Sequence, residues 1–268
     1  MLVALDAFGD AGAVQQSVLD LLRGQLEFTK VAAFDGDALL DYRIRRPTLK
    51  LRSGLISSLT WPAIELEHAV DAEGNHVLLL HGPEPDRMWR PFIDEVLDLA
   101  LRFGTRLLIG VGSFPGPVPH TRPTEVAITS TDPERAQGVS YLPEEIEVPS
   151  SVHGAIEHAA PAHGVDAIGL WAPVPQYAAM QPYQSAAVAL LDRIRELRGF
   201  SVNTETLRIA GDASKRRIDE AIAEKPEHLR MVEMLEQHVE TMEEARATEI
   251  PSGDQLAADF QQFLEEGE

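Results

Sequence analysis

Short apolar runs alternate with longer amphipathic segments along the first 200 residues. Strand-length apolar runs lie at 2–5, 28–34, 106–111, 125–129 and 167–171, and residues 62–80 alternate like a β-hairpin around a turn at 71–75. Helical spacing occurs at 14–22, 89–103, 152–160 and 185–197. Strands that alternate with helices favour right-handed crossovers. The pattern therefore predicts a three-layer α/β/α sandwich with a mostly parallel mixed sheet.

The strand pattern stops near residue 204. Beyond it we expect two or three amphipathic helices with a break at Pro226. The apolar positions 232, 235, 239 and 242 resemble a coiled-coil seam, but two heptads are few, and packing against the main domain is favoured. We predict a core domain at 1–200 and an acidic helical extension at 201–268, with the part beyond Pro251 partly mobile.

Composition and net charge argue against several classes of partner and site. The sequence has no apolar run of about 18 residues and no signal-peptide pattern, so we expect a cytoplasmic protein without a membrane partner. It has no cysteine, which excludes disulfides and thiolate zinc sites. A net charge of −20 would repel phosphate backbones and argues against nucleic acid as a partner. From Ser201 onward, 17 acidic residues face 7 basic ones.

The most informative segment is residues 107–123, a buried strand that runs into a proline-rich loop. A dinucleotide fingerprint fails there because the third glycine comes one residue late and prolines forbid a normal helix interior. A nucleophile elbow needs Gly-x-Ser-x-Gly and fails because Ser113 has Gly112 directly before it and Phe114 and Pro115 after it. What is left is a stiff loop that presents His120, Thr121 and Arg122. Two interpretations stay open, a rigid connection and a binding surface.

Two further loops follow strands at the same expected sheet edge. Asp10 and Gly12 precede the first helix, where Asp10 is better suited to capping than to anion binding. Glu84, Asp86 and Arg87 precede the helix at Trp89, which Asp86 could cap. Together with His81 and His120 these side chains would form one conceivable acid/base site if the loops converge.

Two other groups of polar residues are less specific. His153, His158 and His163 are five residues apart, which turns consecutive members to different faces of a helix, so we expect no metal site. Residues 41–47 are a basic exception in an acidic chain. Their three arginines could bind carboxylates of a partner subunit, be solvated, or form internal ion pairs.

The order of these motifs resembles the proteasome assembly chaperone family of the second type, in its bacterial and archaeal branch. The motifs are residues 8–12, 41–47, 82–86 with Trp89, and 118–123, and residues 172–177 agree with them. The resemblance covers about residues 2–197. It implies a phosphorylase/hydrolase-like α/β/α fold, self-association as a dimer or trimer, and protein partners related to the proteasome. One departure is the C-terminus, which lacks the hydrophobic-Tyr-any-residue tail that such chaperones can use for docking.

Two functional hypotheses follow. The first is a non-enzymatic protein-interaction or assembly factor without a cofactor, with a candidate binding surface at Asp10, Gly12, Glu84, Asp86, Arg87, His120, Thr121 and Arg122. The second is a small-molecule enzyme or sensor of hydrolase or phosphorylase type that uses a pocket at the carboxyl edge of the sheet. No complete catalytic set is present in the sequence to decide for the second.

Overall fold

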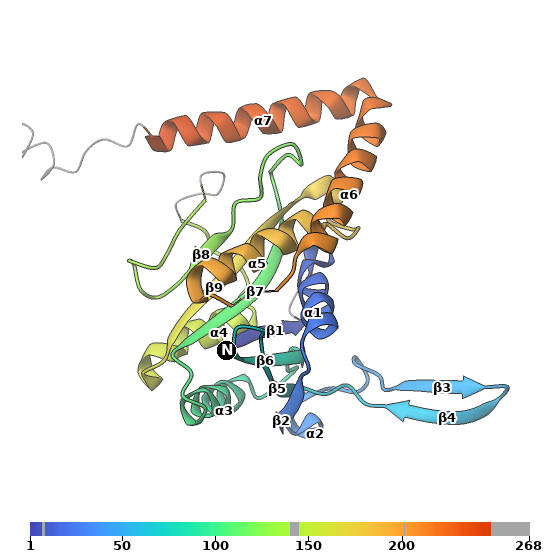
Figure 1. The fold of residues 1–268 in the computed structure, drawn as a ribbon, viewed down its shortest axis with the longest axis vertical. Coiled ribbons are helices and arrows are strands. Elements are labelled where there is room, and N and C mark those ends of the chain that lie inside the picture. Colours follow the sequence, from blue (N-terminus) through green and yellow to red (C-terminus); the bar gives the residue numbers. More distant parts are fainter. Residues whose placement is uncertain (7–8, 140–144, 201, 248–268) are drawn as a thin grey trace, which may run out of the picture.

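A seven-stranded mixed sheet forms the centre of the computed structural model, which describes residues 1–6, 9–139, 145–200 and 202–247 (Figure 1). Its strands are β1 (Leu2–Asp6), β2 (Thr29–Ala33), β5 (Glu65–Val70), β6 (His76–Pro83), β7 (Leu107–Gly116), β8 (Ala127–Thr129) and β9 (Asp166–Pro175). Their order is β2-β5-β6-β1-β7-β9-β8. The central four, β6, β1, β7 and β9, run parallel, while β5 and β8 pair antiparallel with their neighbours.

Helices cover both faces of this sheet. They are α1 (Val14–Gln25), α2 (Gly36–Leu39), α3 (Trp89–Arg102), α4 (Val152–Ala159), α5 (Gln184–Arg198), α6 (Glu205–Ala223) and α7 (Pro226–Ala247), with short 3-10 turns η1 (Ala11–Ala13), η2 (Ala160–His163) and η3 (Gln176–Ala178). Strand β1 shows why both faces are needed. Leu2 and Ala4 pack with α1 and α5, and Val3 and Leu5 pack with α3 and α4. The predicted three-layer sandwich is confirmed.

Strand β7 is longer than its apolar run indicated. We expected it to end near Val111, but it pairs with β9 from Leu107 to Gly116 and includes Pro115. Strand β1 pairs with β7 only up to Gly110, so beyond that point no strand of the described residues pairs with β7 on that side and a proline is tolerated. The proline-rich loop therefore begins after Gly116, five residues later than predicted.

One structural unit was not expected from the sequence. Strands β3 (Thr48–Arg52) and β4 (Leu55–Thr60) form an antiparallel hairpin that projects away from the body of the molecule (Figure 1). Ser53 and Gly54 connect them, both with positive φ (51° and 83°), as in a type I′ turn. We call residues 42–61 the arm.

The C-terminal helices lie against the same end of the molecule as the proline-rich loop. Helix α6 packs on α5, and α7 turns back after the break at Lys225–Pro226 to pass over the loop that follows β7 (Figure 1). Val232 and Val239, two members of the apolar series considered as a coiled-coil seam, are buried. This agrees with packing against the main domain. The segment beyond Pro251, predicted to be partly mobile, lies outside the described residues.

Candidate functional site

His120 is buried within the proline-rich loop, between two other parts of the chain. Its Nε2 lies 2.8 Å from Oδ1 of Asp219 on α6, and its Nδ1 lies 2.8 Å from the hydroxyl of Tyr177. The backbone N–H of His120 donates to the same hydroxyl at 2.8 Å. Burial raises the pKa of Tyr177 to about 12, so that hydroxyl keeps its proton and can donate it to Nδ1. The Nε2–H then donates to Asp219.

The two residues that follow also contact the C-terminal helices. The hydroxyl of Thr121 donates to Glu236, and the guanidinium of Arg122 pairs with Glu240, both on α7. Three consecutive side chains of the loop thus bind three carboxylates of α6 and α7. The acidic extension provides the hydrogen-bond acceptors for this loop, and Glu240 is the counter-ion of Arg122.

A small cavity lies beside this contact. It measures about 190 Å³ and is lined by Val118, Pro119, Arg122, Pro175, Tyr183 and Val239, among others. Burial raises the pKa of Tyr183 to about 12 as well, so its phenol is neutral. The cavity combines apolar walls with the Arg122 guanidinium and the carboxylates of Glu125 and Glu243.

Asp10 and Gly12 belong to the loop that leads into α1. Asp10 accepts hydrogen bonds from the backbone N–H groups of Gln15 and Gln16 at 2.8 and 3.0 Å, which confirms the predicted capping role. Gly12 has φ 66°, and its N–H donates to Ala179 O at 2.7 Å. A Cβ at this position would collide with Tyr183 and Val174. Gly12 is therefore required for packing between this loop and the segment after β9.

The third group has other partners. Asp86 accepts from the Asp41 N–H (2.7 Å) and Arg45 Nε (3.2 Å), so the expectation that it caps α3 is wrong; α3 has no side-chain cap. Arg87 donates to Leu40 O at 2.9 Å. Glu84 accepts from the backbone N–H at the start of α4. These side chains fix the α2 region and α4.

The conceivable acid/base site is therefore not assembled. His81 contacts Arg23 and Glu67, whereas His120 contacts Tyr177 and Asp219. Within the described residues, no hydrogen bond or ion pair joins the Glu84–Asp86–Arg87 group to the His120 loop. In the basic segment, Arg43 pairs with Asp41 and Arg45 with Asp86. Internal ion pairs, one of three open interpretations, account for these two arginines.

The model of the PAC2 family matches residues 4–222 of the chain, which is most of its length and includes the His120 loop and α6. The chain belongs to the PAC2 family. This confirms the resemblance to proteasome assembly chaperones of the second type that the loop motifs indicated.

Solved structures of several bacterial proteins are similar to this chain in sequence and fold. A Mycobacterium tuberculosis protein of unknown function, Rv2714, is 32% identical, with a TM-score of 0.80 over 92% of this chain and 84% of that one. The M. tuberculosis proteasome-assembly chaperone homologue Rv2125 is 28% identical (TM-score 0.79; 86% and 98% covered). A PAC2 family protein from Streptomyces avermitilis is 30% identical (TM-score 0.74; 87% and 98% covered).

A more distant structural neighbour supports the fold alone. The archaeal proteasome activator PbaB of Pyrococcus furiosus shares the fold at 15% identity, with a TM-score of 0.60 and 82% and 91% of the two chains covered. No curated protein matches this PAC2 chain significantly. Among the helices of its described residues, none has both the length and the apolar character that crossing a bilayer needs.

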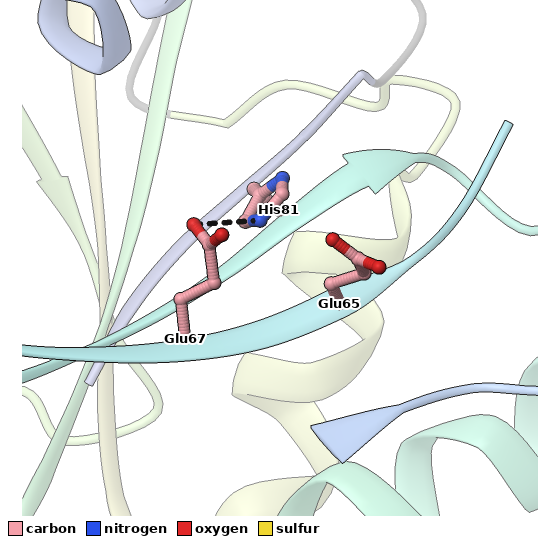
Figure 2. A group of neighbouring side chains, drawn as sticks. All are labelled: Glu65, Glu67 and His81. Carbon is pink, nitrogen blue, oxygen red and sulfur yellow. Dashed lines mark ion pairs between the residues drawn. The ribbon is translucent and has the colours of Figure 1, made fainter. Parts of the chain in front are cut away.

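One cluster in this PAC2 protein has the composition of a metal site. Glu65, Glu67 and His81 point toward one another from β5 and β6, with ligand atoms within 4.8 Å (Figure 2). His81 Nε2 lies 2.9 Å from Glu67 Oε2, and Arg23 Nη2 lies 3.0 Å from the same oxygen. Lys30 pairs with Glu65 at 3.1 Å. Both carboxylates thus already have a cationic partner, and the cluster is balanced as an ion-pair network.

A second polar group lies on α4. Its i, i+4 spacing could have been found in the sequence, but only the five-residue spacing of the histidines was considered there. His153 and Glu157 are four residues apart and face the sheet, both nearly fully buried. His153 Nε2 accepts from the Leu5 N–H at 3.1 Å, and burial lowers its pKa to about 4. Glu157 Oε2 accepts from the Thr129 hydroxyl at 2.6 Å, while its Oε1 has no hydrogen-bond partner. Burial raises the pKa of Glu157 to about 7.

Proposed function

We propose that this PAC2 protein is a non-enzymatic interaction or assembly factor that self-associates through its arm and binds protein partners. The observation that carries the proposal is the distribution of side chains on the hairpin. Leu49 pairs with Leu59 and Leu51 with Ile56, so these four residues share one face. All four are exposed; Leu51 is 59% and Ile56 64% accessible. The other face carries mainly polar side chains, including Lys50 and its partner Ser58.

A hairpin of this kind is unstable by itself. An isolated two-stranded ribbon is marginal in water and needs a surface against which to bury its apolar face. A row of exposed aliphatic residues is typical of an interaction surface. The arm is therefore suited to protein–protein contact rather than to catalysis.

The charge of the arm favours a second copy of the chain as its partner. Residues 42–61 contain five basic residues and no acidic one, whereas the whole chain has a net charge of −20. Arg43 and Arg45 pair with Asp41 and Asp86, and the other three, Arg46, Lys50 and Arg52, form no ion pair with the described residues. The remainder of the chain therefore has a net charge of −25, and a second copy presents an oppositely charged surface. This supports a homo-oligomer, without fixing the number of subunits.

Sedimentation velocity tests self-association through the arm. We expect the wild type to sediment as an oligomer and Leu51→Asn/Ile56→Asn to sediment as a monomer with an unchanged core. The matched control is Thr48→Asn/Thr60→Asn, which changes an exposed pair on the opposite face without changing the charge of the arm and should remain oligomeric. An oligomer that survives the Leu51/Ile56 change would contradict the role of the arm.

Assembly function needs a separate test with purified proteasome subunits. The similar M. tuberculosis protein described as a proteasome-assembly chaperone homologue motivates this choice of partner. We expect saturable binding by the wild type in surface plasmon resonance. Failure to bind any subunit, together with turnover of a small molecule, would contradict the proposal.

The small-molecule hypothesis has one observation in its favour, the cavity of about 190 Å³ beside Arg122 and Tyr183. A thermal-shift screen with nucleosides, phosphate and peptides discriminates, because a ligand at 100 times its Kd adds about 2.7 kcal/mol of apparent stability. A shift that His120→Ala abolishes would favour this second function. A uniform lack of response would leave the interaction role as the better account.

A further inference from the structure

A larger cleft lies at the other end of the sheet, where the parallel strands begin. It measures about 770 Å³ and is formed by residues before and within β1 and β7, the β5–β6 hairpin, the end of α3 and the end of α5. The proline-rich loop follows the carboxyl end of β7, so the two sites lie at opposite edges of the sheet. Neither the family motifs nor the interaction surface proposed above includes this cleft.

The two charged side chains that line the cleft are both arginines, in an otherwise acidic protein. Arg106, just before β7, and Arg198, at the end of α5, both line it, and so do His68 and His76. None of the described residues that line the cleft is Asp or Glu. A chain with 43 acidic and 23 basic residues makes this composition unexpected. Local positive charge in a concave site raises the concentration of anions there.

Neither arginine has a counter-ion among the described residues. The guanidinium groups of Arg106 and Arg198 form no hydrogen bond or ion pair with any described residue. The neighbouring Arg195, by contrast, pairs with Asp192 at 2.9 Å. Each free guanidinium has five N–H donors in a planar arrangement that matches phosphate oxygens. The cleft therefore presents two guanidinium groups that are available to bind an anion.

The histidines add donors of a second kind. His68 Nε2 lies 2.9 Å from His76 Nδ1, and the two rings are stacked with centroids 5.2 Å apart. This contact uses one nitrogen of each ring and leaves the other without a partner among the described residues. The pair is held in place before any ligand arrives, which lowers the entropic cost of binding.

The remaining walls are apolar. Phe103 is 47% exposed at the end of α3, and Phe200 and Ile194 form buried parts of the lining. We propose that this cleft binds an organic phosphate, in which a doubly charged phosphate contacts Arg106 and Arg198 and an apolar or aromatic body packs against the phenylalanines. A doubly charged group is favoured over a single carboxylate because two separate guanidinium groups need neutralising.

Phenyl phosphate is a suitable probe, measured by isothermal titration calorimetry on the full-length protein. We expect saturable binding, with weaker binding of inorganic phosphate, which lacks the apolar body, and of benzoate, which carries one charge. Arg106→Gln and Arg198→Gln should each weaken phenyl phosphate binding about tenfold or more, because each removes charge-assisted hydrogen bonds. Both side chains are exposed, so the variants should fold; an unchanged Tm checks this.

Arg102→Gln is the matched control. Arg102 is an exposed arginine in the last turn of α3 that does not line the cleft, and its replacement changes the net charge by the same amount. Its binding constant should equal that of the wild type. The proposal is overturned if phenyl phosphate shows no saturable binding, if binding survives replacement of both lining arginines, or if Arg102→Gln weakens binding equally.

Discussion

His120 Nε2 lies 2.8 Å from the carboxylate of Asp219, 99 residues further along the chain. The imidazole also accepts a hydrogen bond from the Tyr177 hydroxyl. This one side chain therefore joins the proline-rich loop to the segment after β9 and to α6. Asp219→Ala should leave a buried N–H without its acceptor, at a cost of about 1–2 kcal/mol. We expect faster hydrogen exchange of α6 amides near residue 219, with β1 and β7 unaffected.

Glu220→Ala is the control for that change. Glu220 is the neighbouring exposed acid on α6 and has no hydrogen bond or ion pair with the described residues. Its replacement should leave the exchange pattern unchanged. Equal effects of the two substitutions would show that helix charge, rather than the His120 contact, holds α6.

The contact between the loop and α7 is electrostatic and can be tested by a charge swap. Arg122 and Glu240 are both about half exposed, so the pair contributes roughly 0.2–1 kcal/mol. Arg122→Glu should increase hydrogen exchange in α7, because the new carboxylate faces Glu240. Arg122→Glu with Glu240→Arg should restore it. Exchange that stays high in the double variant would mean that Arg122 acts through other contacts.

Gly169 on β9 tests the packing around Glu157. A Cβ there would collide with Glu157 Oε1, Thr129 Oγ1 and Trp171 Nε1. Gly169→Ala should therefore destabilise the protein by about 1–3 kcal/mol in urea denaturation. Gly24 lies in α1 with open space around it, so Gly24→Ala should instead stabilise the protein, because alanine favours helix. A neutral Gly169→Ala would show that the polar group can move aside.

The sequence predicted the sheet strands and main helices because each carries its own periodicity. Strand β1 and helix α3 show this well, the first as an uninterrupted apolar run and the second with apolar positions at i, i+3, i+4 and i+7. The arm was missed although Leu49 and Leu51 alternate with polar residues. Its apolar face packs on nothing within the described chain, so core patterns do not identify it.

The candidate site could be predicted only in part. His120, Thr121 and Arg122 were singled out from local sequence, but their partners Asp219, Glu236 and Glu240 are about 100 residues or more away. No local pattern specifies such a pairing; it follows from how α6 and α7 return over the loop. The binding role of these residues, and of Asp10, Gly12, Glu84, Asp86 and Arg87, stays a prediction.

The two buried groups on α4 give opposite pH dependences. Glu157 has its pKa raised from 4.5 to about 7, so its stabilising neutral form is fully present below pH 4.5 and is lost as pH rises toward 7. His153 has its pKa lowered from 6.5 to about 4, so its neutral form stabilises above pH 6.5 and this is lost as pH falls toward 4. Between about pH 4.5 and 6.5, the two groups change the stability of the wild type with pH in opposite directions.

Removing one group should therefore reveal the other. In Glu157→Gln, the free energy of unfolding relative to wild type should increase as pH rises from about 4.5 to about 7, by on the order of 3 kcal/mol, because the buried charge no longer forms. His153→Gln keeps an acceptor for Leu5 N–H and should show the opposite trend relative to wild type. Urea denaturation at several pH values measures both. Glu95→Gln, an exposed acid on α3, should run parallel to the wild type at every pH. If the free energy of unfolding of Glu157→Gln also stays parallel to that of the wild type at every pH, the Glu157 carboxyl ionises at an ordinary pKa. Water or local movement must then solvate Oε1.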